Sequence, residues 1–344
     1  MDRNTLIGFI LIGALMVGMF YFNSKGNQAY LADQKRIEDS IARFKKPIDA
    51  ITAKLDSLKY DSARKVQSAG AFQQSVNVAE QLTVVENNVL KITFTNKGGQ
   101  PKQVELKNFK TAAGKPLILQ EGAFNKLSYG INSGTNQTAQ TADLSFVAAP
   151  EAQNADKSKS ISFSIKDSTG REIVHQYTLR PDDYLIDFSI IMNGADRLVT
   201  KNTINLLWQT QTPQLESDIS YEKQQSHICY LDNDKYDFEM IGVEGNSKKF
   251  DVPVNWLAVK QQFFITTLIN KNKFQAAEIN WTVPADTALH TIAKSIANAT
   301  ISLPAGSVAQ VPLQLYYGPS DYNILKAYHN DMESIVPYGS GVFA

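Results

Sequence analysis

The chain has 344 residues, of which 43% are hydrophobic and 20% charged, so it can bury the core of one large or two ordinary domains. Thirty-four basic and 34 acidic residues give a formal net charge of zero. This balance excludes the strongly basic surface of a typical nucleic-acid-binding protein. The one cysteine, Cys229, cannot form an internal disulfide and is predicted to be a small buried hydrophobic residue.

Residues 6–22 form an uncharged apolar run, LIGFILIGALMVGMFYF. A helix needs about 17–25 such residues to cross the hydrocarbon core of a bilayer, so the run predicts a membrane-spanning helix. A cleaved signal peptide is the alternative, but bulky aromatic residues stand where a signal peptidase requires small ones. We therefore expect residues 1–24 to be an uncleaved signal anchor that carries an exported domain. The apolar side chains of this membrane anchor include Leu6, Phe9, Leu11, Leu15, Phe20 and Phe22.

Residues 25–81 are predicted to form a helical stalk followed by a linker, the latter at residues 61–81, which are rich in Ser, Ala and Gln. The stalk could dimerise as a coiled coil, or it could be a single amphipathic helix on its own domain or on the membrane surface. We favour the monomeric helix because the heptad seam is short and Pro47 should kink it. The apolar residues that alternate at spacings of four and three are Ile37, Ile41, Phe44, Ile48, Ile51, Leu55 and Leu58.

Residues 82–319 change to a period of two, which is typical of β-strands. Residues 97–99, Lys-Gly-Gly, are predicted to form the turn of a first hairpin, whose strands contain residues 89–95 and 104–106. The polar residues 130–142 and 150–158 are predicted to be surface loops. Because strand-like runs are numerous and no long helix separates them, we predict a mainly β domain with a large two-sheet sandwich. The other predicted strands lie at residues 116–119, 144–147, 161–165, 172–179, 184–191, 203–209, 263–269, 275–283, 289–303 and 310–317.

The last part of the chain, residues 320–344, is predicted to begin with a helix at residues 321–335. Ser320 or Asp321 can cap its first turn, and Pro337 with Gly339 can end it. We expect this candidate docking helix to pack one face on the sandwich and to direct the chain onward. Its apolar residues, spaced close to the helical period, are Tyr322, Leu325, Tyr328, Met332 and Ile335.

The sequence contains no strong catalytic or metal-binding motif. Its histidines are dispersed, and none has the H-E-x-x-H spacing of a zinc site. The acidic residues 232–239 lack the glycine and terminal glutamate of a calcium-binding loop and are predicted to be a solvated loop. We therefore predict no catalytic residue, no metal, no cofactor and no small-molecule substrate.

Several fragments resemble the YidC family of membrane protein insertases. They are residues 1–7 (MDRNTLI), 97–99 with 104–107 (VELK), 255–264 (NWLAVKQQFF) and 316–319 (YYGP), the last followed by Tyr322, Leu325 and the stop at residues 337–341. The resemblance implies a cytoplasmic N-terminus and a periplasmic β-supersandwich similar to galactose mutarotase-like folds. It also implies five further transmembrane helices, around a groove that contains an arginine, beyond Ala344. Ser340 departs from the aromatic residue that members often carry there.

The resulting expectation is a bacterial inner-membrane protein with a single span in this chain and a large non-catalytic domain in the periplasm. This domain would be a scaffold or docking surface that helps to insert and fold membrane proteins, alone or with the Sec translocon. Its expected partners are nascent membrane proteins, Sec translocon components and the lipid bilayer, but not nucleic acid. The alternative is a membrane-anchored carbohydrate-binding or mutarotase-like enzyme, in which Trp256 or Trp281 would stack on a sugar ring. Trp256 is, however, predicted to belong to the core.

Overall fold

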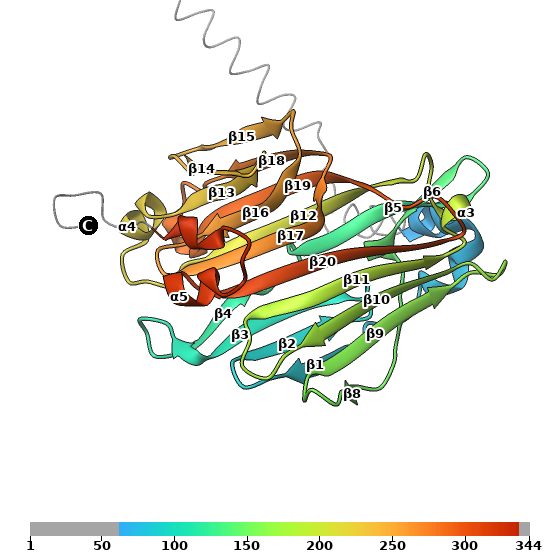
Figure 1. Ribbon diagram of the computed structural model, residues 1–344, viewed down its shortest axis with the longest axis horizontal. Coiled ribbons are helices and arrows are strands. Elements are labelled where there is room, and N and C mark those ends of the chain that lie inside the picture. Colours follow the sequence, from blue (N-terminus) through green and yellow to red (C-terminus); the bar gives the residue numbers. More distant parts are fainter. Residues whose placement is uncertain (1–61, 337–344) are drawn as a thin grey trace, which may run out of the picture. The chain divides into compact units, whose positions relative to one another are not determined.

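The computed structural model describes residues 62–336, which form a mainly antiparallel β structure (Figure 1). The predicted membrane anchor and the predicted stalk up to residue 61 lie outside the described residues, as do residues 337–344. Within the described part, no helix combines the length and the apolar character needed to cross a membrane.

The first sheet has four strands in chain order, β1 (Leu82–Glu86), β2 (Leu90–Thr95), β3 (Gln100–Lys110) and β4 (Pro116–Gln120). The predicted turn between β2 and β3 is confirmed, and its glycines Gly98 and Gly99 adopt left-handed φ angles of 76° and 55°. A side chain at Gly99 would also collide with Phe163, since an added Cβ would lie 2.7 Å from the Phe163 Cβ. Glycine is therefore required here for both conformation and close packing.

A second sheet has six strands, in the order β15-β18-β19-β12-β5-β6. Residues 130–142, predicted to be a loop, instead form much of the β5–β6 hairpin, so that prediction is wrong. Residues 130–134 continue β5, which pairs with β12 through residues 126–129, and they pair through their backbone with β6. The strands are β5 (Lys126–Gly134), β6 (Gln137–Gln140), β12 (Thr203–Pro213), β15 (Gly245–Phe250), β18 (Ala276–Thr282) and β19 (Thr291–Ser302).

The largest sheet has ten strands, in the order β14-β13-β16-β17-β20-β11-β10-β9-β7, with β8 paired to β9. The acidic residues 232–239, predicted to be a loop, form the β13–β14 hairpin instead. The predicted strand at residues 144–147 largely precedes the short β7. The strands are β7 (Val147–Ala148), β8 (Ala152–Gln153), β9 (Lys159–Lys166), β10 (Glu172–Leu179), β11 (Leu185–Asn193), β13 (His227–Asp232), β14 (Lys235–Met240), β16 (Val254–Lys260), β17 (Phe264–Phe274) and β20 (Val308–Pro319).

Short helices connect and cover the strands. Residues 62–69 are helical and continue into η1; Ala69, at the end of the helix, and Phe72, in η1, are buried against the core. Part of the segment predicted to be a linker therefore packs on the domain, because its few apolar side chains point to one side. The helical elements are η1 (Gly70–Ser75), η2 (Thr141–Asp143), α3 (Ala195–Leu198), α4 (Ile219–Gln224), η3 (Thr287–Leu289), α5 (Tyr322–Lys326) and η4 (Met332–Ile335).

Both smaller sheets pack on one face of the ten-stranded sheet. His175 and Tyr177 are two residues apart on β10 and therefore point to the same side. The ring of Phe94 on β2 lies 4.7 Å from that of Tyr177, and the Tyr129 hydroxyl on β5 lies 2.8 Å from His175 Nε2. The predicted sandwich is thus confirmed as two layers, but one layer is divided between two sheets. We call the face with His175 and Tyr177 the inner face and the opposite one the outer face.

Candidate docking surface at the C-terminal segment

The C-terminal segment, residues 321–336, begins as predicted and then departs from the prediction. The Asp321 carboxylate caps α5 by accepting bonds of 2.9 and 3.1 Å from the backbone N–H groups of Asn323 and Ile324. The chain leaves the helix after Lys326, because His329 and Asp331 adopt left-handed φ angles of 52° and 62°. A continuous helix over residues 321–335 is therefore wrong, and two short helices, α5 and η4, take its place.

This segment lies on the outer face of the ten-stranded sheet. Tyr230 on β13 contacts Phe250 of β15 across the core, at a ring distance of 4.7 Å, so its neighbour Leu231 points outward. Trp256 on β16 pairs with Leu231 and also points outward. Its Nε1–H donates a 2.9 Å hydrogen bond to the backbone oxygen of Asn330. The C-terminal segment therefore covers strands β13 and β16 from outside.

The predicted docking residues divide into buried and half-buried side chains. Leu325, Met332 and Ile335 are at most 2% exposed and belong to the hydrophobic core. Tyr322 and Tyr328 are half-buried at its margin. Fully burying a side chain of this size contributes about 1.5–3 kcal/mol, so the three buried residues hold the segment firmly on the sheet.

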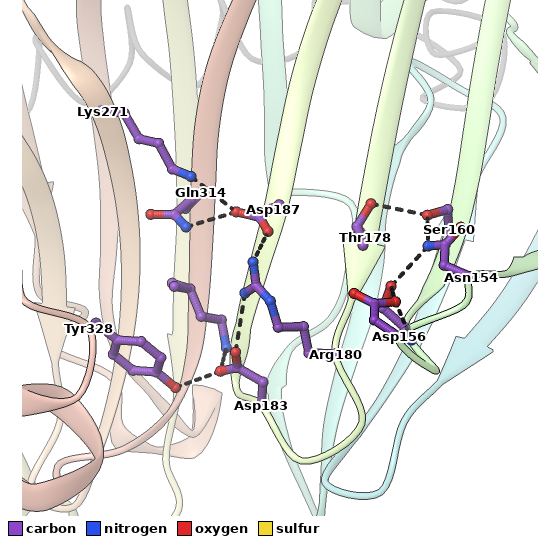
Figure 2. Close-up of polar contacts among 12 residues, drawn as sticks. Asn154, Asp156, Ser160, Thr178, Arg180, Asp183, Asp187, Lys271, Gln314 and Tyr328 are labelled. Carbon is purple, nitrogen blue, oxygen red and sulfur yellow. Dashed lines mark hydrogen bonds and ion pairs between the residues drawn. The ribbon is translucent and has the colours of Figure 1, made fainter.

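A polar network continues from this segment across the outer face (Figure 2). The Tyr328 hydroxyl donates a 2.7 Å hydrogen bond to the Asp183 carboxylate, and burial together with this bond raises the pKa of Tyr328. Asp183 and Asp187 are bridged by the guanidinium of Arg180. The hairpin between β10 and β11 is thereby tied to the C-terminal segment.

Asp187 extends the network to the next strands (Figure 2). It accepts hydrogen bonds of 2.8 Å from Gln314 Nε2 on β20 and 3.4 Å from Lys271 Nζ on β17. The network borders a groove of about 410 Å³ whose floor is apolar and whose rim is polar, a combination suited to binding a partner segment. The groove is lined by Leu185, Leu231, Asn255, Trp256, Ile269, Asn270, Lys271, Gln314, Tyr328, His329, Asn330 and Asp331.

The sequence did not single out this network. In the sequence, Asp187 and Gln314 are polar residues within segments that alternate between apolar and polar side chains. This alternation predicts that they point outward, and it is the one sequence feature that hints at the network. They become neighbours because β11 and β20, more than 100 residues apart in the chain, pair in the register Asp187↔Gln314. Sequence periodicity assigns a face to a residue but not its partner across the sheet.

The tryptophans proposed as sugar platforms are both in the core. Trp256 is 0% exposed, as predicted, and Trp281 is 2% exposed. The Trp281 Nε1–H donates a 2.9 Å hydrogen bond to the backbone oxygen of Ile241. In this conformation neither indole face is open to stack on a sugar ring.

Two buried titratable groups also have structural roles. Cys229 is 0% exposed, and burial raises its pKa to about 12, which confirms the prediction of a small buried hydrophobic residue. His175 lies on the inner face between the Tyr129 hydroxyl and the backbone oxygen of Gly98, 2.9 Å from its Nδ1. Burial lowers the pKa of His175 to about 4, so its ring is neutral near pH 7.

Residues 82–343 match the family model of the YidC periplasmic domain. The membrane protein insertase YidC of Phocaeicola vulgatus is 29% identical over 331 residues, covering 94% of this chain and 52% of that protein. The same-named protein of Parabacteroides distasonis is 27% identical over 367 residues, covering 100% of this chain and 57% of that protein. The chain thus spans about half the length of the curated relatives that it matches.

Among solved structures, a galactose mutarotase related enzyme from Lactobacillus acidophilus is similar over 69% of this chain and 97% of its own, with a TM-score of 0.41 and 10% identity. A putative mutarotase from Salmonella typhimurium is similar over 70% of this chain and 91% of its own, with a TM-score of 0.44 and 7% identity. The family match covers far more of the chain than the separate fragments noted in the sequence, and it confirms the resemblance that they suggested. This chain belongs to the family of the YidC periplasmic domain.

Proposed function

We propose that this domain is a non-catalytic scaffold of a membrane protein insertase, held in the periplasm by the predicted anchor at residues 6–22. Its partners would be nascent membrane proteins and components of the Sec translocon. The domain would position the insertase relative to these partners, and its docking surface would be the groove beside the C-terminal segment.

The attachment of the C-terminal segment to the outer face carries this proposal. Leu325, Met332 and Ile335 are buried, and the Trp256 indole holds the backbone at Asn330. The position of the chain at residue 336 is therefore coupled to the ten-stranded sheet. A segment fixed to the sheet would hold this domain in a set position relative to the rest of the insertase. A loose linker would instead let the domain and the rest of the insertase move independently.

The insertase role is supported by the family and by the names of the relatives, which are membrane protein insertases. The enzyme alternative loses support because the two carboxylates of the network beside the groove are already engaged: Asp183 and Asp187 share Arg180, and Asp187 also accepts from Lys271 and Gln314. Such pairing suits recognition and positioning more than proton transfer.

The test replaces one buried and one half-buried residue of the C-terminal segment in a full-length insertase that contains this domain. Leu325→Asp with Tyr328→Asp should detach the segment and reduce membrane insertion of a client protein several-fold in a depletion strain. Ala327→Asp places a single negative charge on an exposed position of the segment and should leave insertion unchanged. Replacement of residues 82–303 by an unrelated domain also removes most of the sheet that holds the segment, so it should reduce insertion at least as strongly.

Protease resistance of the sandwich distinguishes detachment of the segment from unfolding of the domain. The proposal is wrong if the double variant inserts clients as well as the unmodified protein does while replacement of residues 82–303 abolishes insertion. Turnover of a sugar, or tight glycan binding in the groove, would instead favour an enzyme.

A further inference from the structure

Strand β1 is the outermost strand of the four-stranded sheet within the described residues. Two backbone hydrogen bonds bracket it: Asn96 N–H donates to the oxygen of Gln81, and Asn87 N–H donates to the oxygen of Leu90, both at 3.0 Å. Residues 81, 83, 85 and 87 therefore bond toward β2. In an antiparallel strand the alternate residues point the other way, so Leu82, Val84 and Glu86 direct their N–H and C=O groups to the open edge.

The side chains on this edge are exposed and apolar. Leu82 is 55% and Val84 is 50% exposed. Sheet edges are usually protected by charged side chains, proline or bulges, and the edge strand β14 carries Lys235, Asp237 and Glu239. Strand β1 contains no proline and no charged residue before Glu86, and its pairing with β2 runs without a bulge. Among residues 62–336, no strand pairs with this outer edge of β1.

The charged residues that flank β1 on the same sheet are already neutralised. Each acidic side chain is paired with a basic one from the domain itself, so the edge presents little net charge to a partner. An uncharged strand is the complementary ligand, because a charged one would find no free counterion. The pairs are Glu80–Lys102 at 2.6 Å, Glu86–Lys107 at 3.6 Å and Lys91–Glu105 at 3.9 Å.

We propose that the open edge of β1 binds an extended, uncharged segment of a client membrane protein by β-strand addition. The backbone groups of Leu82 and Val84 would bond to the client strand, and alternate apolar side chains of the client would cover those of β1. This inference rests on the proposed insertase function, since it names the class of client segment. A second copy is a poorer occupant, because a strand of five residues buries far less than the about 1,200 Å² of a stable dimer.

The test uses the 344-residue chain in detergent micelles and a fluorescent peptide of about eight alternating Val and Thr residues. Fluorescence anisotropy should detect binding of this peptide. The same peptide with N-methyl groups on alternate residues has lost its donors and should bind about tenfold more weakly or not at all. Equal binding of the two peptides would show that no strand is added.

Two variants and a matched control locate the site. Val84→Lys adds a charge at the edge, and Val84→Pro removes only an outward-facing N–H; each should weaken binding about tenfold while the melting temperature stays close to that of the unmodified chain. Val147→Lys changes an exposed valine of another outer strand, β7, and should bind normally. If Val84→Lys binds as tightly as Val147→Lys, the proposal is wrong.

Sedimentation of the same samples tests the other occupant. A dimer that Val84→Lys converts to a monomer would mean that β1 pairs with a second copy, which would overturn a client segment as its ligand. The strand-addition proposal and the insertase proposal can fail independently, because the β1 variants leave the C-terminal segment unchanged. Loss of insertion in Leu325→Asp with Tyr328→Asp, together with unaffected peptide binding in Val84→Lys, would reject only the strand-addition proposal.

Discussion

Strands β16 and β10 belong to the same ten-stranded sheet, yet they bury their side chains in different ways. All residues of β16 except Asn255 are buried, whereas β10 alternates between half-buried and buried positions along its whole length. The difference arises because the C-terminal segment covers β16 from outside and does not cover β10. A sheet with one solvated face becomes a two-sided core wherever a terminal segment lies on it.

The largest effect is expected where both faces are covered. Trp256→Ala should lower the free energy of unfolding by about 3–5 kcal/mol, because it leaves a cavity and removes the hydrogen bond to Asn330. Val174→Ala, at a half-buried position of β10, should cost about 1 kcal/mol or less. Chemical denaturation of the two variants measures the difference. Equal losses would contradict the comparison between covered and uncovered strands.

His175, on the inner face, should make the free energy of unfolding depend on pH. Burial lowers its folded pKa from 6.5 to about 4, so the folded state disfavours the protonated ring. The stabilisation is complete above pH 6.5 and is lost as pH falls toward 4, by about 3 kcal/mol in total. Denaturation curves at pH 7 and pH 4 should show this loss.

Two variants test whether His175 causes this pH dependence. His175→Gln should remove this part of the pH dependence, although His227, whose pKa burial also lowers to about 4, and carboxylates elsewhere in the chain will still contribute. His290→Gln, at an exposed histidine, is the matched control. A loss of stability that is equally steep in His175→Gln would show that another group titrates.

The smallest effect is expected at the margin of the covered region. Tyr328→Phe removes the 2.7 Å hydrogen bond to Asp183 and should cost about 1–2 kcal/mol. Tyr221→Phe, at a 48% exposed position of α4, should cost about 0.5 kcal/mol or less. A double-mutant cycle with Asp183→Asn isolates the coupling between the two side chains. An absence of coupling would mean that the network is held by Arg180 and Asp187 instead.

The sequence by itself determined the features that depend on neighbouring residues. The alternation at residues 172–179 predicts β10 over its whole length, and one of the two predicted helix caps, Ser320 or Asp321, is correct: Asp321 caps α5. The Lys-Gly-Gly turn after β2 was predicted for the same reason. A strand period, a cap and a tight turn each require particular residues within a few positions, so they are visible in a short window of sequence.

Only the tertiary structure decided which surfaces meet. The β5–β6 hairpin was missed because its polar side chains carry no strong period, and β5 is held by backbone pairing with β12. The C-terminal helix ends at Lys326, and the chain then turns at two left-handed residues, His329 and Asp331. The backbone oxygen of Asn330 between them accepts a hydrogen bond from Trp256, more than 70 positions earlier in the chain. The Asp183–Tyr328 contact likewise joins residues 145 positions apart. These contacts depend on the order of strands in the sheets, which local propensity and periodicity do not contain.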